Sequence, residues 1–277
     1  MLNRLLKNVR KFAMPLVWHR HLIANIAEQG RRAAYADMAA KTPDNPALRG
    51  FKAWSQTDED GIIQEIFRRL GGKSESFIEI GCGDGLENNT HYLLLKGWSG
   101  LWIDGGPQNI AAIRANLPAN PERLQVREMF LDADNVKTIA AEVDFLSIDV
   151  DGNDLHLLRS FVQVAKPRVI CAEYNAKFPP PLFATVAYDE GHVWKADDYM
   201  GASLSALVKV LSDYTLVCCG IAGLNAYFVR SDFRQCFTFY TPEELYQPSR
   251  ISLFHPWPGH PSSYGFLANE LKPKISG

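Results

Sequence analysis

The chain has 277 residues, a formal net charge of −2, and 47% hydrophobic and 22% charged residues. This composition predicts a globular protein with a full apolar core, built as one large domain or as one domain with an extension. The near-neutral charge argues against nucleic acid as the default partner. The five cysteines show no framework spacing, which predicts reduced core thiols and a cytoplasmic location.

The N-terminal residues differ in charge from the rest of the chain. Residues 1–32 carry seven Lys/Arg and one acid (+6), and the other 245 carry 22 Lys/Arg and 30 acids (−8). Apolar residues recur between the basic ones at helical spacing, namely Leu2, Leu5, Leu6, Val9 and Phe12. We expect residues 1–48 to form a basic helical extension. Either it packs on the domain as an arm or lid, or residues 1–32 bind a partner or contact the inner face of a membrane peripherally.

No membrane span is expected, because no apolar run approaches the roughly 18 residues that a span requires. No signal peptide is expected either, because the apolar run 12–18 is short and no small-residue cleavage site clearly follows it. Residues 55–70 predict a capped amphipathic helix, with acids at its start and Arg68 and Arg69 near its end. The apolar run 77–80 follows and is typical of a strand covered on both faces. Gly81, Gly83 and Gly85 then predict a sharp turn that leads into another helix.

From this turn onward, strands and helices alternate. Strands are expected at 101–103, 124–131, 143–149 and 168–173, and helices at 107–117, 153–165 and 203–211. Two further strands, 214–219 and 226–230, have no helix between them, which predicts an antiparallel hairpin at the sheet edge. The predicted fold is therefore α/β: a doubly wound, Rossmann-like seven-stranded sheet with an antiparallel terminal hairpin strand, plus the helical N-terminal extension. The Pro- and aromatic-rich tail, 241–277, is expected to pack on the surface without regular structure.

The glycine turn indicates which cofactor the domain binds. A dinucleotide site needs G-x-G-x-x-G, but Leu86 occupies the place of the third glycine. Asp84 also puts a negative charge where a pyrophosphate would lie. Glu79, just before the turn, fits a cationic ligand better. An NAD-linked oxidoreductase is therefore the less favoured alternative.

The segment from Glu79 to Gly85 resembles motif I of class I S-adenosylmethionine (SAM) methyltransferases, E/D-x-G-x-G-x-G. Asp104 lies about 21 residues past Gly83, where the family places an acid on the ribose hydroxyls. The terminal hairpin matches the reversed seventh strand of the family. The segments S-Q-x-x-E-D-G-I-I, I-D-V-D-G-N-D and A-E-Y-N narrow the resemblance to the FkbM-type methyltransferases, often found in natural-product and polysaccharide gene sets.

The resemblance covers about residues 50–232 and implies a SAM-dependent methyltransferase domain at 49–240. It implies cofactor-binding roles for eight residues: Gln56, Glu79, Gly81, Gly83, Asp84, Asp104, Asp132 and Asp149. Asp132 closes the third strand, where the family often contacts adenine. Asp104 also has a plainer interpretation, because it could cap the helix that Pro107 opens.

The acceptor side of the site is expected at the ends of the fourth and fifth strands, since ligands of open α/β sheets lie beyond the carboxyl ends. Asp149, Asp151 and Glu173 are the candidate catalytic carboxylates, and together with Asn175 they are the candidate ligands of Mg²⁺ or another divalent metal. The alternative is that residues 151–154 form only a turn and a helix cap. His192, in the long loop after the fifth strand, is a candidate general base. Trp194 in the same loop suits a sugar or another hydroxylated ring.

These features predict O-methylation of a hydroxyl on a sugar, glycan or other hydroxylated small molecule. The alternative from another class is a catalytically silent SAM-fold protein that binds a membrane or partner through its basic N-terminal helix. The sequence leaves the oligomeric state open, and a homo-oligomer remains a candidate.

Overall fold

Seven strands form one sheet in the computed structural model, which describes residues 2–72, 75–119, 122–254 and 263–272, with side chains from residue 21 onward. The sheet order is β3-β2-β1-β4-β5-β7-β6. The strands are β1 (Ser76–Ile80), β2 (Ser99–Asp104), β3 (Leu124–Glu128), β4 (Phe145–Ile148), β5 (Val169–Glu173), β6 (Tyr214–Cys219) and β7 (Asn225–Arg230). Neighbouring strands pair in parallel, except that β7 runs antiparallel to both β5 and β6. The predicted α/β fold with its reversed hairpin strand is confirmed.

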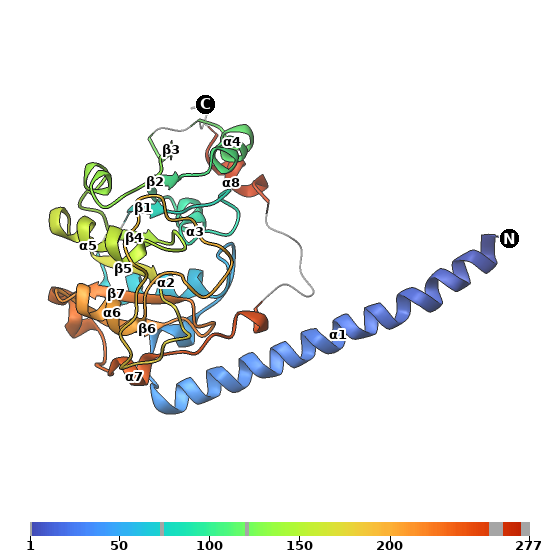
Figure 1. Ribbon diagram of the computed structural model, residues 1–277. Helices are drawn as coiled ribbons and strands as arrows, with labels where there is room; N and C mark the ends of the chain where they lie inside the picture. The colour runs from blue at the N-terminus through green and yellow to red at the C-terminus, as the bar shows by residue number, and fades with distance from the viewer. Residues whose placement is uncertain (1, 73–74, 120–121, 255–262, 273–277) are drawn as a thin grey trace.

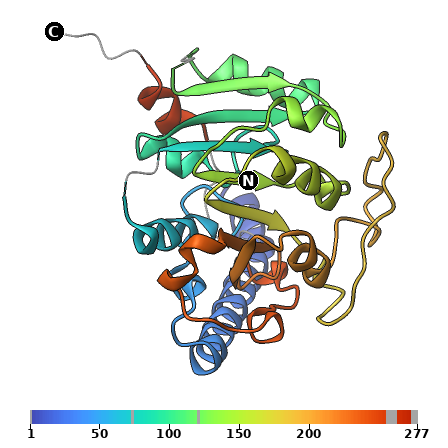
Figure 2. The ribbon, with the colours of Figure 1, turned by 90° about the vertical axis from the view of Figure 1, so that its left-hand side faces the viewer.

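Helices cover both faces of the sheet (Figures 1 and 2). One apolar core joins the sheet to α5 (Asp154–Val164), α6 (Leu204–Val210), α7 (Pro242–Leu245) and η2 (Asn135–Thr138). The other core joins it to α2 (Glu59–Leu70), α3 (His91–Leu95), α4 (Pro107–Asn116), α8 (Gly265–Glu270), η1 (Pro46–Arg49) and the end of α1 (Leu2–Lys41). Two short 3-10 helices complete the chain, η3 (Ser231–Cys236) and η4 (Ile251–Leu253).

Several element boundaries differ from the prediction. The predicted helix 55–70 begins only at Glu59, because the Asp60 carboxylate accepts hydrogen bonds from three backbone N–H groups of residues 53–55 and holds them in a loop. The predicted strand 124–131 ends at Glu128.

The prediction that the tail lacks regular structure is wrong for its described residues. Thr241 and Glu244 form a capping box that starts α7, and Leu267 and Leu271 bury their side chains at and just beyond α8. Residues 255–262 and 273–277 of the tail lie outside the described residues. The three-part division of the chain stays a prediction.

The N-terminal extension is one helix, α1, and among its described side chains the contacts with the body lie in its last third. Ala34 and Met38 are buried, and the Tyr35 hydroxyl donates a 2.7 Å hydrogen bond to Asp58. The rest of α1 projects away from the sheet (Figure 1). Within the described part of the chain, no helix combines the length and apolar character needed to cross a membrane.

The turn after β1 requires glycine at position 81. Gly81 has a φ of +81° and its N–H donates to the carbonyl of Ile103. A Cβ placed on Gly81 would lie 1.6 Å from the carbonyl oxygen of Asp149. Because that oxygen belongs to the chain just after β4, any side chain here would push the ends of β1 and β4 apart.

We therefore expect Gly81→Ala to destabilise the protein more than Gly97→Ala does. Gly97 has a φ of +94° but nothing within 4 Å of its added Cβ, so it isolates the cost of the backbone conformation. That cost is about 1–2 kcal/mol. Urea unfolding measures both variants, and equal midpoints would contradict the close approach of the two chain segments at Gly81.

Candidate active site

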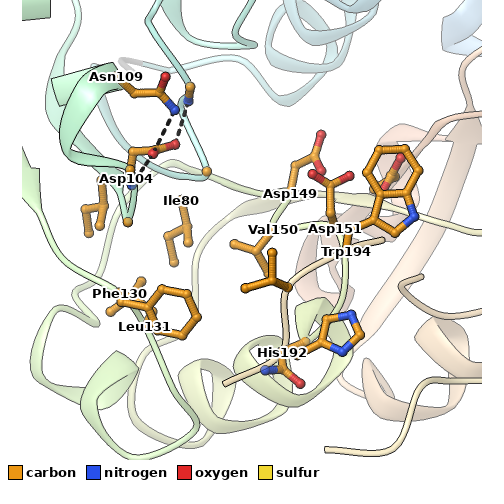
Figure 3. A pocket seen from close by; sticks show the side chains of 18 of the residues that line it. Ile80, Asp104, Asn109, Phe130, Leu131, Asp149, Val150, Asp151, His192 and Trp194 are labelled. Carbon is orange, nitrogen blue, oxygen red and sulfur yellow. Dashed lines mark hydrogen bonds between the residues drawn. The ribbon is translucent and has the colours of Figure 1, made fainter. Parts of the chain in front are cut away.

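A cavity of about 930 Å³ opens at the carboxyl edge of the sheet, where β1, β2, β4 and β5 end together (Figure 3). A second pocket of about 170 Å³ adjoins it and shares Gln56, Gly81, Gly83 and Asp149 with it. The long loop between β5 and α6 extends beyond the strand ends (Figure 2) and contributes His192, Val193 and Trp194 to the wall of the larger cavity.

Asp104 ties the end of β2 to the glycine turn after β1. Its carboxylate accepts hydrogen bonds from the Gly83 N–H (2.9 Å), the Gly106 N–H (2.7 Å) and the Asn109 side-chain amide (3.0 Å), as Figure 3 shows. The Asp104 carboxylate is therefore hydrogen-bonded both to the glycine turn and to the start of α4. It also lines the cavity.

An apolar wall lies beside Asp104. Ile80, Ile103, Met129, Phe130 and Leu131 line this part of the cavity. Phe130 is 52% exposed, so one of its faces is open to a ligand. Asp132, the expected adenine contact, is not among the lining residues. Its carboxylate accepts from the N–H groups of Asp134 and Asn135 and so starts η2.

Glu79 holds a segment of its own chain, and its expected role in cofactor binding stays a prediction. Its buried carboxylate accepts hydrogen bonds from the Asn88 amide, from the N–H groups of Asn89 and Thr90, and from the Thr90 hydroxyl. Burial raises the pKa of Glu79 to about 7. Glu79 therefore holds the loop before α3, and it lines only the smaller pocket, as do Asp84 and Cys82.

A loop that precedes α2 brings Gln56 to both pockets. The Asp60 carboxylate holds this loop through the N–H groups of Ala53, Trp54 and Ser55 at 2.6, 2.7 and 3.0 Å. Lys52 adds a hydrogen bond to the Gln56 carbonyl. Residues 53–58 therefore form a clasped loop that Asp60, in the first turn of α2, holds in place, and the helix begins only after this loop.

Three carboxylates gather where β4 and β5 end. Asp149, Asp151 and Glu173 each offer an oxygen, and these oxygens lie within 4.8 Å of one another. Burial, followed by the nearby acids, raises the pKa values of Asp149 and Glu173 well above those of ordinary carboxyl groups. One oxygen of Glu173 is buried and has no hydrogen-bond partner among the described residues.

The turn that carries Asp151 is held by Asp154, which accepts from the N–H groups of Val150 (2.7 Å) and Gly152 (2.8 Å). Asp151 itself has a φ of +56°, a strained value for a residue other than glycine. The predicted turn at residues 151–154 is thus present, and Asp149 and Asp151 line the cavity, where their catalytic role stays a prediction.

His192 packs against this turn, since a Cβ on Gly152 would lie 2.1 Å from its ring. Its Nε2 is buried and finds no partner within the described part of the chain. Asn175 does not line the cavity. Its amide donates to the carbonyls of Asp198 and Met200 and thereby anchors the long loop.

The sequence analysis missed several lining residues. Gln108 and Asn109 come from the first turn of α4, and Asn153, Met200 and Leu224 come from loops. The position of Pro107 at the start of a helix was a usable signal for Gln108 and Asn109, because residues of that turn face the preceding strand end. Met200 and Leu224 carry no comparable pattern.

Fold and cavity together define an α/β protein with a mostly parallel sheet and a ligand cavity at its carboxyl edge. Neither the family models nor the curated proteins contain a match to this chain.

Solved structures resemble the chain at low similarity. Magnesium protoporphyrin IX methyltransferase (ChlM) from Synechocystis PCC 6803 with bound SAM matches 64% of this chain and 79% of its own, at 13% identity and a TM-score of 0.43. Monomeric WbdD matches 68% of this chain and 43% of its own, at 19% identity and a TM-score of 0.41. The O-methyltransferase from Bacillus cereus in complex with S-adenosylhomocysteine (SAH) matches 57% of this chain and 74% of its own, at 16% identity and a TM-score of 0.37. The chain thus spans less than half of WbdD. At these TM-scores the likeness does not extend to a reaction.

Asp58, beside the clasped loop, makes the stability of the protein depend on pH. It is 2% exposed and accepts from the hydroxyls of Tyr35 and Thr57. Burial, together with the neighbouring Glu59, raises its pKa from 3.8 to about 7. The folded protein therefore holds this proton more tightly than the unfolded chain. The protonated Asp58 carboxyl therefore contributes its full stabilisation below about pH 4, and this stabilisation is lost as the pH rises through about 7.

We expect Asp58→Asn to remove this dependence. Both hydroxyl partners can accept as well as donate, so the amide leaves no buried group unpaired. The difference in free energy of unfolding between wild type and variant should fall by roughly 2–4 kcal/mol between pH 4 and 7, and stay constant above. Asp37→Asn, at an exposed position of α1, is the control. Parallel curves for wild type and D58N would contradict the raised pKa.

Proposed function

We propose that the chain is a SAM-dependent methyltransferase that methylates a hydroxyl group of a sugar, glycan or other hydroxylated small molecule. The observation that carries the proposal is the Asp104 carboxylate bonded to the Gly83 N–H at the cavity wall. It puts a fixed acceptor for a ribose diol next to a glycine turn, with the apolar wall of Ile103, Phe130 and Leu131 available for a purine.

The charge of the site favours a cationic donor over a diphosphate. Asp84 lines the smaller pocket beside Gly81, where a negative charge would stabilise the sulfonium and the amino group of SAM. The same charge would repel a pyrophosphate in this place, and Leu86 takes the position of the glycine that a dinucleotide needs. Gln56 reaches this pocket from the clasped loop and adds hydrogen-bonding capacity.

SAM supplies an electrophilic methyl group, so the protein has to orient an acceptor oxygen and remove its proton. Asp149, Asp151 and Glu173 are placed to do this at the cavity floor. Burial and crowding raise their pKa values, so each carboxylate holds a proton more strongly than an ordinary one and is a stronger base toward an acceptor hydroxyl. His192, with its unpartnered Nε2, is the second candidate base.

The same carboxylates fit a hard divalent cation such as Mg²⁺, because three oxygens lie close together and one oxygen of Glu173 lacks a partner among the described residues. A bound metal would lower the pKa of the acceptor hydroxyl. Asn175 is a weaker candidate ligand than the sequence implied, since its amide holds the long loop.

We further propose that the acceptor is a sugar or similar ring and that the enzyme is of the FkbM type. Trp194 lines the cavity opposite the apolar wall and is 41% exposed, and a flat aromatic face beside carboxylates suits a sugar ring. The segments S-Q-x-x-E-D-G-I-I and I-D-V-D-G-N-D support the FkbM type. Both segments supply parts of the site, namely the loop of Gln56 and the turn of Asp151.

Calorimetry with SAH tests the cofactor. We expect wild-type protein to bind SAH and to ignore NAD. Asp104→Asn should weaken SAH binding at least about tenfold, because hydrogen bonds to a charged group contribute about 1.5–3 kcal/mol. Asp37→Asn should leave it unchanged. Equal SAH affinity in D104N and wild type would exclude the ribose role of Asp104, and binding of NAD without SAH would refute the methyltransferase proposal.

Turnover tests the carboxylates. Release of SAH from SAM is followed with a panel of hydroxylated glycosides, with and without EDTA and added Mg²⁺. Asp151→Asn and Glu173→Gln should each lower kcat by about 10²–10⁴-fold, the usual size of a general-base contribution. Loss with EDTA and recovery with Mg²⁺ would support a metal. Full activity of both variants in EDTA would remove these acids from the mechanism, and SAH binding without any turnover would favour the catalytically silent alternative.

A further inference from the structure

The first two thirds of α1 extend beyond the body, and between residues 21 and 29, where side chains are described, no contact with the described body is found. Its contacts with the rest of the chain begin near Gly30 and Arg31, which lie against Leu253. Before them, Leu22, Ile23 and Ile26 are 57%, 57% and 58% exposed. Figure 1 shows the helix continuing straight away from the sheet beyond this point. Three large apolar side chains in water on a projecting helix indicate a surface that binds something.

The projecting segment is also strongly basic. Residues 1–27 contain five Lys/Arg (Arg4, Lys7, Arg10, Lys11 and Arg20) and no acid, a charge of +5. The remaining residues contain 24 Lys/Arg against 31 acids, a charge of −7. The helix therefore has the opposite charge to the body that it leaves, and its preferred partner is an anionic surface.

Part of the apolar pattern follows the helix. At 3.6 residues per turn, Leu5, Phe12, Leu16 and Ile23 fall on one face. Lys7, Arg10 and Lys11 fall on the other side together with Met14 and Trp18, and Arg4 lies five turns before Leu22 and so on the same side as that residue. Residues 1–27 therefore combine an apolar stripe with basic residues and no acid, a composition suited to the interface of an anionic bilayer.

A second copy of α1 is a poorer occupant. Helices that pair along an apolar face normally set charges of opposite sign beside the seam. Residues 1–27 offer only basic ones, so two paired copies would bring like charges together and repel each other.

We propose that residues 2–26 of α1 bind the surface of an anionic lipid bilayer and hold the body beside it. Leu22, Ile23 and Ile26 enter the interface, and the basic residues contact the lipid headgroups. This inference does not depend on the reaction of the cavity, because its readout is binding alone.

Co-sedimentation of the full-length protein with vesicles tests the proposal. We expect binding to vesicles of phosphatidylcholine mixed with phosphatidylglycerol, little binding to phosphatidylcholine alone, and release at high salt. Each basic residue near an anionic surface should strengthen partitioning roughly fivefold. The variant R4Q/K7Q/R10Q/K11Q should therefore bind at least about tenfold more weakly. The variant L22Q/I23Q/I26Q should lose binding as well.

The matched control is V164Q/F239Q, which changes two apolar residues of the body that are 57% and 66% exposed. It should bind like wild type, and all variants should unfold at the wild-type temperature. Wild-type protein that stays in the supernatant with anionic vesicles would overturn the proposal. So would equal binding by all variants, or a dimer in sedimentation velocity that L22Q/I23Q/I26Q converts to monomer while vesicles bind neither form.

Discussion

The hydrogen bond from the Gly83 N–H to Asp104 is the interaction on which the cavity depends. It joins the chain after β1 to the end of β2, two segments that line the cavity. Gly81 makes this junction feasible, because its missing side chain lets the carbonyl of Asp149 approach the turn. The ends of three strands thereby converge within one wall. Every proposed role of the cavity uses that convergence.

Buried acids organise the loops around this junction. Asp60 clasps the loop of Gln56, Glu79 holds the loop before α3, and Asp154 supports the turn of Asp151. Each of these carboxylates accepts hydrogen bonds from backbone N–H groups that have no partner within a helix or strand. Carboxylates are strong acceptors for this purpose, but burial favours their protonated forms. The site therefore combines acids that shape loops with three further acids, Asp149, Asp151 and Glu173, whose oxygens lie close together at the cavity.

The sequence predicted the sheet well because its strands are short, buried and apolar, and because the hairpin of β6 and β7 has no room for a helix. It also placed Asp104, Asp149 and Glu173 correctly at the cavity, since residues at the carboxyl ends of parallel strands share one edge. The sequence did not predict which hydrogen-bond partner a polar side chain takes when several are within reach. Nothing local distinguishes an acid that caps a helix from one that clasps a preceding loop, as Asp60 does, or shows that Asn175 turns toward the long loop. The tail failed for a different reason, because α8 is stabilised by contacts with residues far away in the sequence.

One of those distant contacts bears on how the protein matures. The Tyr264 hydroxyl donates to the carbonyl of Asp84 in the glycine turn, across 180 residues, and Arg123 pairs with Glu270 on α8. During synthesis on the ribosome, the strands that frame the cavity emerge long before Tyr264 does. The nascent chain can thus assemble its sheet while the turn beside the cavity is still unsecured. The contact that fixes the turn beside the cavity therefore forms as a late step.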